Sequence, residues 1–353
     1  MAESRLPAGG ARGAVTPPVA ATAAPDAPLA DQARGWFARR HRWRLWEAIP
    51  WLAGGAVYFL LPDYLAFGSQ VLLTIVFALS IDLIVGYAGV VSLGHAAFFG
   101  LGAYASGMAS AHLGWTEPIS SLMLAAGVAG AVGLASGAVL LRYHGLTLLM
   151  LTLATAAFLR ELANANEGIT GGFDGLTGIS FAPVLGLFDY DLWGRTYYLY
   201  SLAVLFVVFL ICRRLVHSPF GQSLVGIREN RLRMQAIGAP VYRRLVGIYA
   251  VSAAVAGVAG GLFAQTNTFV TLDVLDFSRS GTILIIIILG GIGRLYGAFA
   301  GAVLYMVLED ELAKLSPEFW EFGVGVVLVL MVLFARGGVL GWLDRWRKPE
   351  HRR

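Results

Sequence analysis

The side chains of this chain that could do chemistry are few, and the most conspicuous is a carboxylate inside an apolar run. Asp82 lies in the stretch Ser80-Ile81-Asp82-Leu83. A carboxylate at membrane depth is costly and by default indicates a polar path, a proton relay or a buried partner. A structural hydrogen bond to the backbone or to Ser80 explains Asp82 equally well. His95 follows a break at Gly94, and we interpret it as a polar residue at a helix start rather than a metal ligand.

Hydroxyl and aromatic side chains extend this candidate path. Thr152 and Thr155 could line it, although threonine is also a routine packing residue between membrane helices. The candidate translocation path comprises Asp82, Ser92, His95, Phe98, Phe99, Thr152 and Thr155.

Little else in the sequence resembles catalysis. A phosphate-binding loop needs Gly before its Lys and Ser or Thr after it, and neither Lys314 nor Lys348 meets this pattern. Any use of ATP and Mg must therefore come from a partner. The histidines have no metal-ligand spacing, and the single Cys212 excludes an internal disulfide. We expect no catalytic residue, no metal site and no bound cofactor, so the chain is predicted not to be an enzyme.

The segment 213–244 is basic and polar between long apolar runs, and its turn signals predict two short helices. Ser218 is an N-cap residue followed by Pro219 at the first helical position. Asn230 can cap a second helix, Arg231 to Ile237, which Gly238 ends.

The second of these short helices is predicted to present apolar side chains on a basic surface. The side chains in question are Leu232, Met234, Ala236 and Ile237. Such a helix between two membrane spans suits the groove of a partner protein. An ordinary cytoplasmic loop held by lipid headgroups is the alternative.

The elements that position these residues are long apolar segments. Of the 353 residues, 57% are hydrophobic and 14% are charged, against about 25% charged in soluble domains. A membrane-spanning helix needs about 20 apolar residues, and this length predicts an all-α membrane protein with about ten spans, some short or glycine-broken. The spans are predicted near 46–62, 64–86, 90–112, 119–141, 145–163, 197–212, 245–265, 281–292, 296–312 and 318–334.

The charges of the connecting loops predict which side of the membrane each loop occupies. With the N-terminus inside, the inside loops are 142–144, 213–244, Arg294 and 335–353, and they hold most of the arginines. The outside loops are 164–196, 266–280 and 313–317. They carry Glu167, Asp174, Asp189, Asp191, Asp273 and Asp276, with Arg195, Arg279 and Lys314 as exceptions.

The chain is therefore divided into a membrane domain and two tails. Residues 1–45 are rich in Ala, Pro and Gly and end in an arginine cluster, which predicts a disordered, basic cytoplasmic tail rather than a signal peptide. The transmembrane domain is predicted over 46–341, and 342–353 is predicted to be a second basic cytoplasmic tail.

Two glycine-rich breaks and one long loop stand out within the membrane domain. The runs Gly86–Gly89 and Gly290–Gly293 look alike, which indicates either an internal repeat flanking a translocation path or close packing of helices. The loop 164–196 carries the turn-rich run Thr170–Ile179. We interpret it as a solvent-exposed turn cluster or as an external docking surface or gate.

These motifs together resemble the permease subunits of branched-chain amino-acid ABC importers, specifically the M-type subunit, with urea-type permeases as close relatives. The resemblance covers about residues 64 to 341. It rests on Gly86 through Tyr104, Thr170 through Leu176, Arg228 through Gly238, Ser252 through Gly257, and Gly290 through Gly297.

The resemblance implies a bacterial inner-membrane importer with several partners. These are a second, H-type permease, two cytoplasmic ATPases that use ATP and Mg, and a periplasmic solute-binding protein. It further implies that the loop with Thr170, Gly171, Gly172 and Asp174 lies where the binding protein docks. The coupling contact with an ATPase would involve Arg228, Glu229, Asn230, Arg231, Met234, Ala236 and Gly238.

Two rival functions remain open from the residues themselves. An ion-coupled secondary transporter would use Asp82 as its carrier, and a membrane-embedded enzyme would use Asp82 with His95. The substrate is also open, because family members often carry Asn in place of Asp82. Branched-chain amino acids, urea, amides and aromatic acids all fit the sequence.

Overall fold

A computed structural model describes residues 45–184, 194–334 and 337–341. The predicted tail 1–45, apart from its last residue, and the tail 342–353 lie outside the described residues. Asp189 and Asp191 of the predicted outer loop also lie outside them. The division into one domain and two tails stays a prediction.

The described part of the chain is built from helices. The long ones are α2 (Ile49–Leu60), α3 (Leu65–Ile81), α4 (His95–Leu113), α5 (Pro118–Leu140), α6 (Leu146–Ala165), α8 (Arg195–Val216), α9 (Pro219–Glu229), α11 (Val241–Asn267), α12 (Phe277–Gly290), α13 (Leu295–Leu315) and α14 (Trp320–Phe334). The short ones are η1 (Leu45–Ala48), η2 (Pro62–Tyr64), η3 (Asp82–Tyr87), α7 (Glu167–Thr170), η4 (Gly172–Asp174), α10 (Arg231–Ala236) and η5 (Leu272–Leu275).

Each of the ten apolar segments predicted from the sequence contains a helix, which confirms an all-α membrane protein. Five continuous helical stretches are long and apolar enough to cross a membrane, namely Pro62–Tyr87, Pro118–Leu140, Leu146–Ala165, Arg195–Val216 and Val241–Asn267. The helices α2 and α14 are apolar but shorter. The count of ten complete spans stays a prediction.

The pair α12 and α13 forms the sixth candidate span. The two helices are long and apolar enough to cross a membrane only when they are taken together, and the chain bends by 111° at the break between them. The break is the second glycine-rich run of the sequence, where Gly291 ends α12 with its N–H bonded to Ile287 O at 2.8 Å. Glycine at such a sharp bend lets the two helix ends approach closely.

The helices α4, α5 and α11 pack tightly through small residues. Gly257 of α11 lies so close to α5 that an added Cβ would be 2.5 Å from Ala129 Cβ. The same added atom on Gly102 of α4 would be 2.5 Å from Gly257 Cα. Small residues at such crossings bring the backbones into van der Waals contact, which is the main attraction between helices in lipid.

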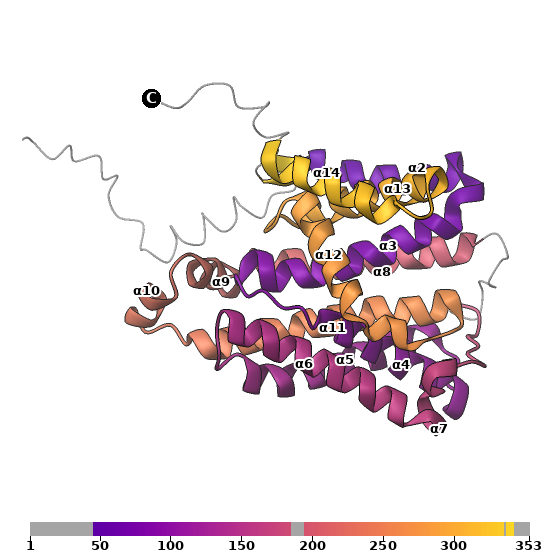
Figure 1. Cartoon of the computed structure of the whole chain (residues 1–353), viewed down its shortest axis with the longest axis horizontal. Coiled ribbons are helices and arrows are strands. Elements are labelled where there is room, and N and C mark those ends of the chain that lie inside the picture. The colour runs from indigo at the N-terminus through magenta and orange to yellow at the C-terminus, as the bar shows by residue number, and fades with distance from the viewer. Residues whose placement is uncertain (1–44, 185–193, 335–336, 342–353) are drawn as a thin grey trace, which may run out of the picture. The chain divides into compact units, whose positions relative to one another are not determined.

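The connecting loops gather into two groups. The first contains the segments 86–94, 141–145, 213–244 and 291–294, and we call it the basic face. The helices α9 and α10 lie at this end of the long helices, and α7 lies at the other end (Figure 1).

The second group contains 113–117, 166–184 and 266–277, and we call it the acidic face. Its loops hold one another: Leu176 and Val270 form an isolated antiparallel bridge, and Ala182 N donates to Thr116 O at 2.8 Å. The two groups are those that alternation of the spans predicts for opposite sides of a membrane.

Candidate functional site

The helix α9 begins as the sequence predicts. Ser218 Oγ accepts a hydrogen bond from Gly221 N at 3.2 Å, and Pro219 occupies the first helical position. Leu224 and Ile227 are buried under the helix. Arg244 of α11 donates to Ser223 Oγ at 2.6 Å. The helix is therefore fixed to the membrane domain and can transmit a displacement to it.

The helix α10 is capped at both ends. Asn230 Oδ1 accepts from Arg233 N at 2.9 Å. At the other end Gly238 takes a left-handed φ of 81°, its N–H bonds to Gln235 O at 2.9 Å, and Ala239 N bonds to Met234 O at 3.0 Å. This pair of bonds is a Schellman motif, which satisfies carbonyls that the helix end leaves open. The predicted caps are confirmed, and the helix ends one residue earlier than predicted.

The exposed apolar side chains of α10 are the feature that the sequence predicts for a docking helix. Leu232 is 77% exposed and Ile237 is 71% exposed. Met234 was expected among them, but its sulfur packs over Gly226 of α9, where an added Cβ would lie 2.8 Å from Sδ. Met234 therefore holds α10 on α9. Leu232 and Ile237, with the small exposed Ala236, are the apolar contacts left for a partner.

Arg228, the next-to-last residue of α9, turns toward the membrane domain. Its guanidinium donates a hydrogen bond to the carbonyl of Gly86. Its side-chain stem covers Gly89, where an added Cβ would be 2.6 Å from Arg228 Cγ. It also lies against Gly293, at 2.8 Å from where a Cβ would be. A residue predicted to contact an ATPase thus bonds to one glycine-rich break of its own chain and lies against the other.

Asp82 joins the same two breaks from inside. It is wholly buried, and its Oδ1 accepts a hydrogen bond from Gly293 N at 2.7 Å. Gly86 must be glycine here, because an added Cβ would lie 2.6 Å from Gly293 N. The carboxylate therefore makes the structural backbone bond that the sequence left as one of its two explanations. We call Arg228, Gly86, Gly293 and Asp82 the glycine-break cluster.

His95 begins α4, as predicted, and takes part in a buried chain of hydrogen bonds. Its Nε2 lies 2.7 Å from Ser252 Oγ, which in turn donates to Ser80 O at 2.5 Å. Because the Ser252 hydroxyl donates its proton to Ser80 O, it can only accept from His95, so Nε2 of His95 carries the proton and donates to Ser252 Oγ. The next residue, Ala96, donates its N–H to Ser280 Oγ of α12 at 2.8 Å.

The other predicted path residues are also used in packing. Thr152 Oγ1 donates to Leu149 O and accepts from Leu93 N, which fixes the break before α4. Ser92 Oγ accepts from Gly94 N at 3.3 Å. Thr155 Oγ1 donates to Leu151 O. Phe99 lines the cavity described below, and the path role of the whole predicted set stays a prediction.

The loop on the acidic face is an ordered turn, and its predicted docking role stays a prediction. Thr170 is buried, and its Oγ1 bonds to Ala163 O at 2.6 Å and to Asn166 O at 2.9 Å. Gly172 is buried as well. These two residues shape the turn, and Asp174 and Phe173, which is 86% exposed, are left at the surface. A large apolar side chain between a glycine and an aspartate, in a turn-rich run, was the available signal for Phe173.

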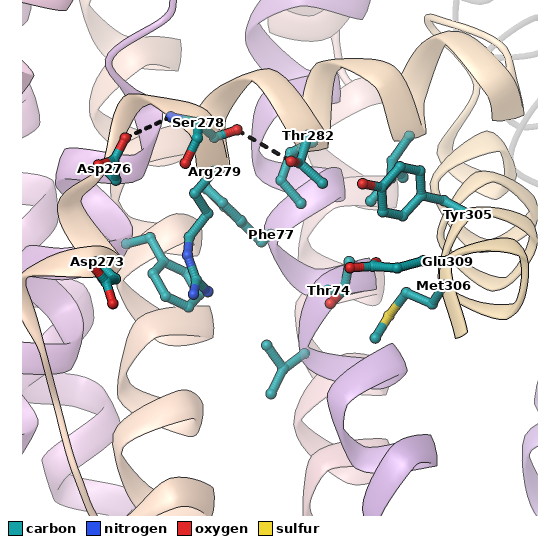
Figure 2. Close-up of a pocket in the computed structure, with 14 residues that line it drawn as sticks. Thr74, Phe77, Asp273, Asp276, Ser278, Arg279, Thr282, Tyr305, Met306 and Glu309 are labelled. Carbon is teal, nitrogen blue, oxygen red and sulfur yellow. Dashed lines mark hydrogen bonds between the residues drawn. The ribbon is translucent and has the colours of Figure 1, made fainter. Parts of the chain in front are cut away.

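A cavity of about 330 Å³ lies between α3, α4, η5, α12 and α13, with its rim on the acidic face. Figure 2 shows side chains from these elements turned toward one another around it. Its charged members are Asp273, Asp276, Arg279 and Glu309. Its hydroxyl and apolar members are Thr74, Ser278, Thr282, Tyr305, Leu73, Phe77, Phe99, Ile283, Ile286 and Met306.

Sequence reasoning did not assign this cavity, although two of its residues carried a signal. Arg279 is an arginine on the otherwise acidic face, and Glu309 lies at the end of an apolar run. Both are charges beside membrane-length segments, which marks a functional position by default. What could not be read was that α12 and α13, joined by a sharp bend, bring them to one cavity.

The arrangement defines a class of protein: a multi-pass helical membrane permease with a capped, exposed helix on one face and a polar cavity opening on the other. The sequence profile described as "Branched-chain amino acid transport system / permease component" matches residues 64–335. No solved structure matches the chain.

Three relatives carry names of the same kind. The high-affinity branched-chain amino acid transport system permease protein LivM of Escherichia coli (strain K12) is 30% identical over 291 residues, 75% of this chain and 67% of that protein. The protein of the same name from Salmonella typhimurium is 30% identical over 296 residues, 77% and 68% of the two chains. The probable LivM of Methanocaldococcus jannaschii is 25% identical over 242 residues, 61% of this chain and 67% of that protein.

The chain belongs to the family of branched-chain amino-acid transport permeases and is a membrane subunit of an ABC importer. Members of the family are permease components and are not themselves enzymes. The ion-coupled alternative gains no support, because the family and the relatives are named as permease components of branched-chain amino acid transport systems.

Proposed function

We propose that this permease imports branched-chain or similar apolar amino acids, driven by two cytoplasmic ATPases that contact α10. The relatives are named for branched-chain amino acids, which supports this substrate. The observation that carries the proposal is the link between α10 and the membrane domain. An exposed, capped helix follows shortly after Arg228, which bonds to the first glycine break and lies against the second.

The surface of α10 suits an ATPase groove with an acidic rim. Leu232 and Ile237 supply the apolar contacts, and Arg231 and Arg233 add positive charge beside them. Interface energy concentrates in a few buried apolar anchors, while rim charges act mainly on the association rate and on specificity. ATP and Mg are used by the partners in this scheme, and this chain binds neither.

The other partners follow from the two faces. A binding protein delivers the substrate to the acidic face, near Phe173 and Asp174, and a second permease completes the translocation path. The basic face lies in the cytoplasm and the acidic face outside the inner membrane of a bacterium, because arginine-rich loops stay on the cytoplasmic side.

The partners are tested by mild-detergent purification of the full chain from native membranes, with mass spectrometry of the proteins that co-purify. We expect a second permease, ATPases with phosphate-binding loops and an extracytoplasmic binding protein. Recovery of the chain alone, under conditions that keep a known ABC importer intact, would overturn the assembly.

Coupling through α10 is tested by Gly238→Val. A β-branched residue in the left-handed region costs about 1–2 kcal/mol, so the Schellman end of α10 is lost. We expect the ATPases to remain bound while substrate transported per ATP hydrolysed falls by about 10-fold. Both quantities are measured in proteoliposomes.

The matched control is Gly127→Val in α5. Gly127 has no neighbour within 4 Å of an added Cβ, and its φ is outside the left-handed region. Gly127→Val should leave coupling within about 2-fold of wild type. The cost expected at Gly238 arises only where a β-branched residue is forced into the left-handed region. Normal coupling in Gly238→Val with the ATPases bound contradicts the role of α10.

A further inference from the structure

Arg279 presents an unpaired guanidinium to the cavity on the acidic face. Its Cζ lies 5.0 Å from the centre of the Phe99 ring and 5.1 Å from that of Phe263. The two rings hold the guanidinium by cation–π contact. It makes no hydrogen bond or ion pair with any side chain among the described residues, so its N–H groups are available to an acceptor in the cavity.

The carboxylates around the same cavity are not equivalent. Asp276 Oδ1 accepts from Ser278 N at 2.9 Å and so caps α12. Asp273 lies exposed on the rim. Glu309 of α13 is half-buried, and in the described part of the chain its carboxylate has no hydrogen bond or ion pair. Figure 2 shows Arg279 entering from α12 and Glu309 from α13, with apolar side chains between these helices.

We propose that this cavity is a substrate site within the permease itself and that it recognises an α-amino acid zwitterion with an aliphatic side chain. Arg279 receives the carboxylate, Glu309 receives the ammonium, and Phe77, Ile283 and Met306 enclose the side chain. A planar guanidinium binds a carboxylate through two parallel hydrogen bonds. The cavity lies within the range of roughly 300–1,000 Å³ that holds small ligands. This inference rests on the importer function proposed above.

The charges of the cavity separate this ligand from the other solutes that the sequence left open. Three carboxylates against one guanidinium make the site negative, so an aromatic or aliphatic monoanion is repelled by the charges that would attract an ammonium. Urea and small amides are neutral and leave the apolar walls in contact with water. A zwitterion with an apolar side chain matches all three parts of the cavity.

The test measures binding of three probes to the purified permease complex without its binding protein. L-leucine has both charges, leucinamide has only the ammonium, and 4-methylpentanoate has only the carboxylate. We expect Arg279→Gln to weaken binding of L-leucine by roughly 10- to 100-fold, as for loss of a charged hydrogen bond, and to leave leucinamide within about 2-fold. Glu309→Gln should weaken L-leucine and leucinamide and should not weaken 4-methylpentanoate, which the negative charge of the site makes the weakest of the three probes in the wild type.

This pairing of variant and probe cannot arise from a general loss of structure, which would weaken all probes together. The matched control is Asp310→Asn, which removes the same charge from the next residue of α13. Asp310 pairs with Lys314 at 2.6 Å and does not line this cavity, so Asp310→Asn should bind L-leucine as wild type does.

The outcomes separate the site from the importer function. If the ATPases co-purify and coupling is normal, but Arg279→Gln and Glu309→Gln bind every probe like wild type, the substrate site is overturned and the importer function stands. Equal weakening of all probes by either variant also overturns it. If the wild-type chain carries no ATPase, the importer function itself fails.

Discussion

The basic face and the acidic face use their charged residues in opposite ways. On the basic face arginines bond inward: Arg228 to Gly86, Arg244 to Ser223, and Arg213 to Glu47. On the acidic face Glu167 and Asp174 are exposed and make no ion pair with described residues, and Arg279 points into a cavity without one. These three arginines of the basic face are bonded within the chain, whereas these charges of the acidic face stay available. Asp276, which caps α12, and Arg231, at the start of α10, are exceptions.

This difference fits the two tasks of an ATP-driven permease. A face that receives force from a partner must be joined to the segments it moves, and a conformational change follows only if the partner binds the two states with different affinity. A face that receives a polar solute must offer groups whose hydrogen bonds are not already satisfied. The three predictions below test this comparison.

The largest effect is expected at the apolar contact of α10. Leu232→Asp places a charge where the partner's groove is apolar, and loss of such an anchor costs about 2 kcal/mol or more. We expect affinity for the ATPase to fall by about 30-fold or more, measured by titration of the purified ATPase against the permease in nanodiscs.

Gln235→Asp on the same helix is the control, because it adds the same charge without removing an apolar side chain. It should weaken binding by less than about 5-fold, as for a charge at the rim. Equal losses in the two variants would mean that charge alone governs docking.

An intermediate effect is expected from Arg228→Ala, which removes the bond from α9 to Gly86. A hydrogen bond to a charged group contributes about 1.5–3 kcal/mol when buried, and Arg228 is partly exposed, so about 10-fold in coupling is expected. ATPase affinity should stay within about 2-fold. The measurement is substrate transported per ATP in proteoliposomes.

Arg231→Ala should behave in the opposite way. Arg231 follows the cap of α10 and is placed to contact the partner, so its loss should lower ATPase affinity severalfold, more at low salt, and leave coupling unchanged. If Arg228→Ala and Arg231→Ala both lower coupling, or both lower ATPase affinity, then the two arginines do not have the separate roles assigned to them here.

The smallest effect is expected on the acidic face at Phe173. Phe173→Ala should weaken docking of the binding protein by roughly 5-fold, about 1 kcal/mol, because few interface residues contribute more than this. Surface plasmon resonance with the binding protein checks it. Thr177→Ala, also exposed in the same loop, should change nothing, and an equal loss there would show a disturbed loop rather than a lost contact.

The helices and caps could be predicted because their signals are local. Apolar length marked the helices, and Ser218, Asn230 and Gly238 marked the ends of α9 and α10 through bonds to residues a few positions away. The exposure of Leu232 and Ile237 could be predicted because α10 lies in a basic, polar segment that is expected to be in contact with water.

The partners of buried residues could not be predicted, because they are distant in the sequence. Asp82 bonds to Gly293, 211 positions away, and Arg228 to Gly86, 142 positions away. The cavity joins residues of five elements, and its position depends on the 111° bend between α12 and α13. Met234 was misjudged although Gly226 is near it in the sequence, because their contact depends on how α10 folds back on α9.

Cys212 is the one thiol of the chain and is wholly buried in α8. Maleimides that do not cross a bilayer should therefore not react with the surface of the native chain. A cysteine introduced at an exposed position, such as Thr177 on the acidic face or Gln235 on the basic face, is the only group that such a reagent can label. The unaltered chain thus serves as its own blank for mapping, in living cells, which face meets which compartment.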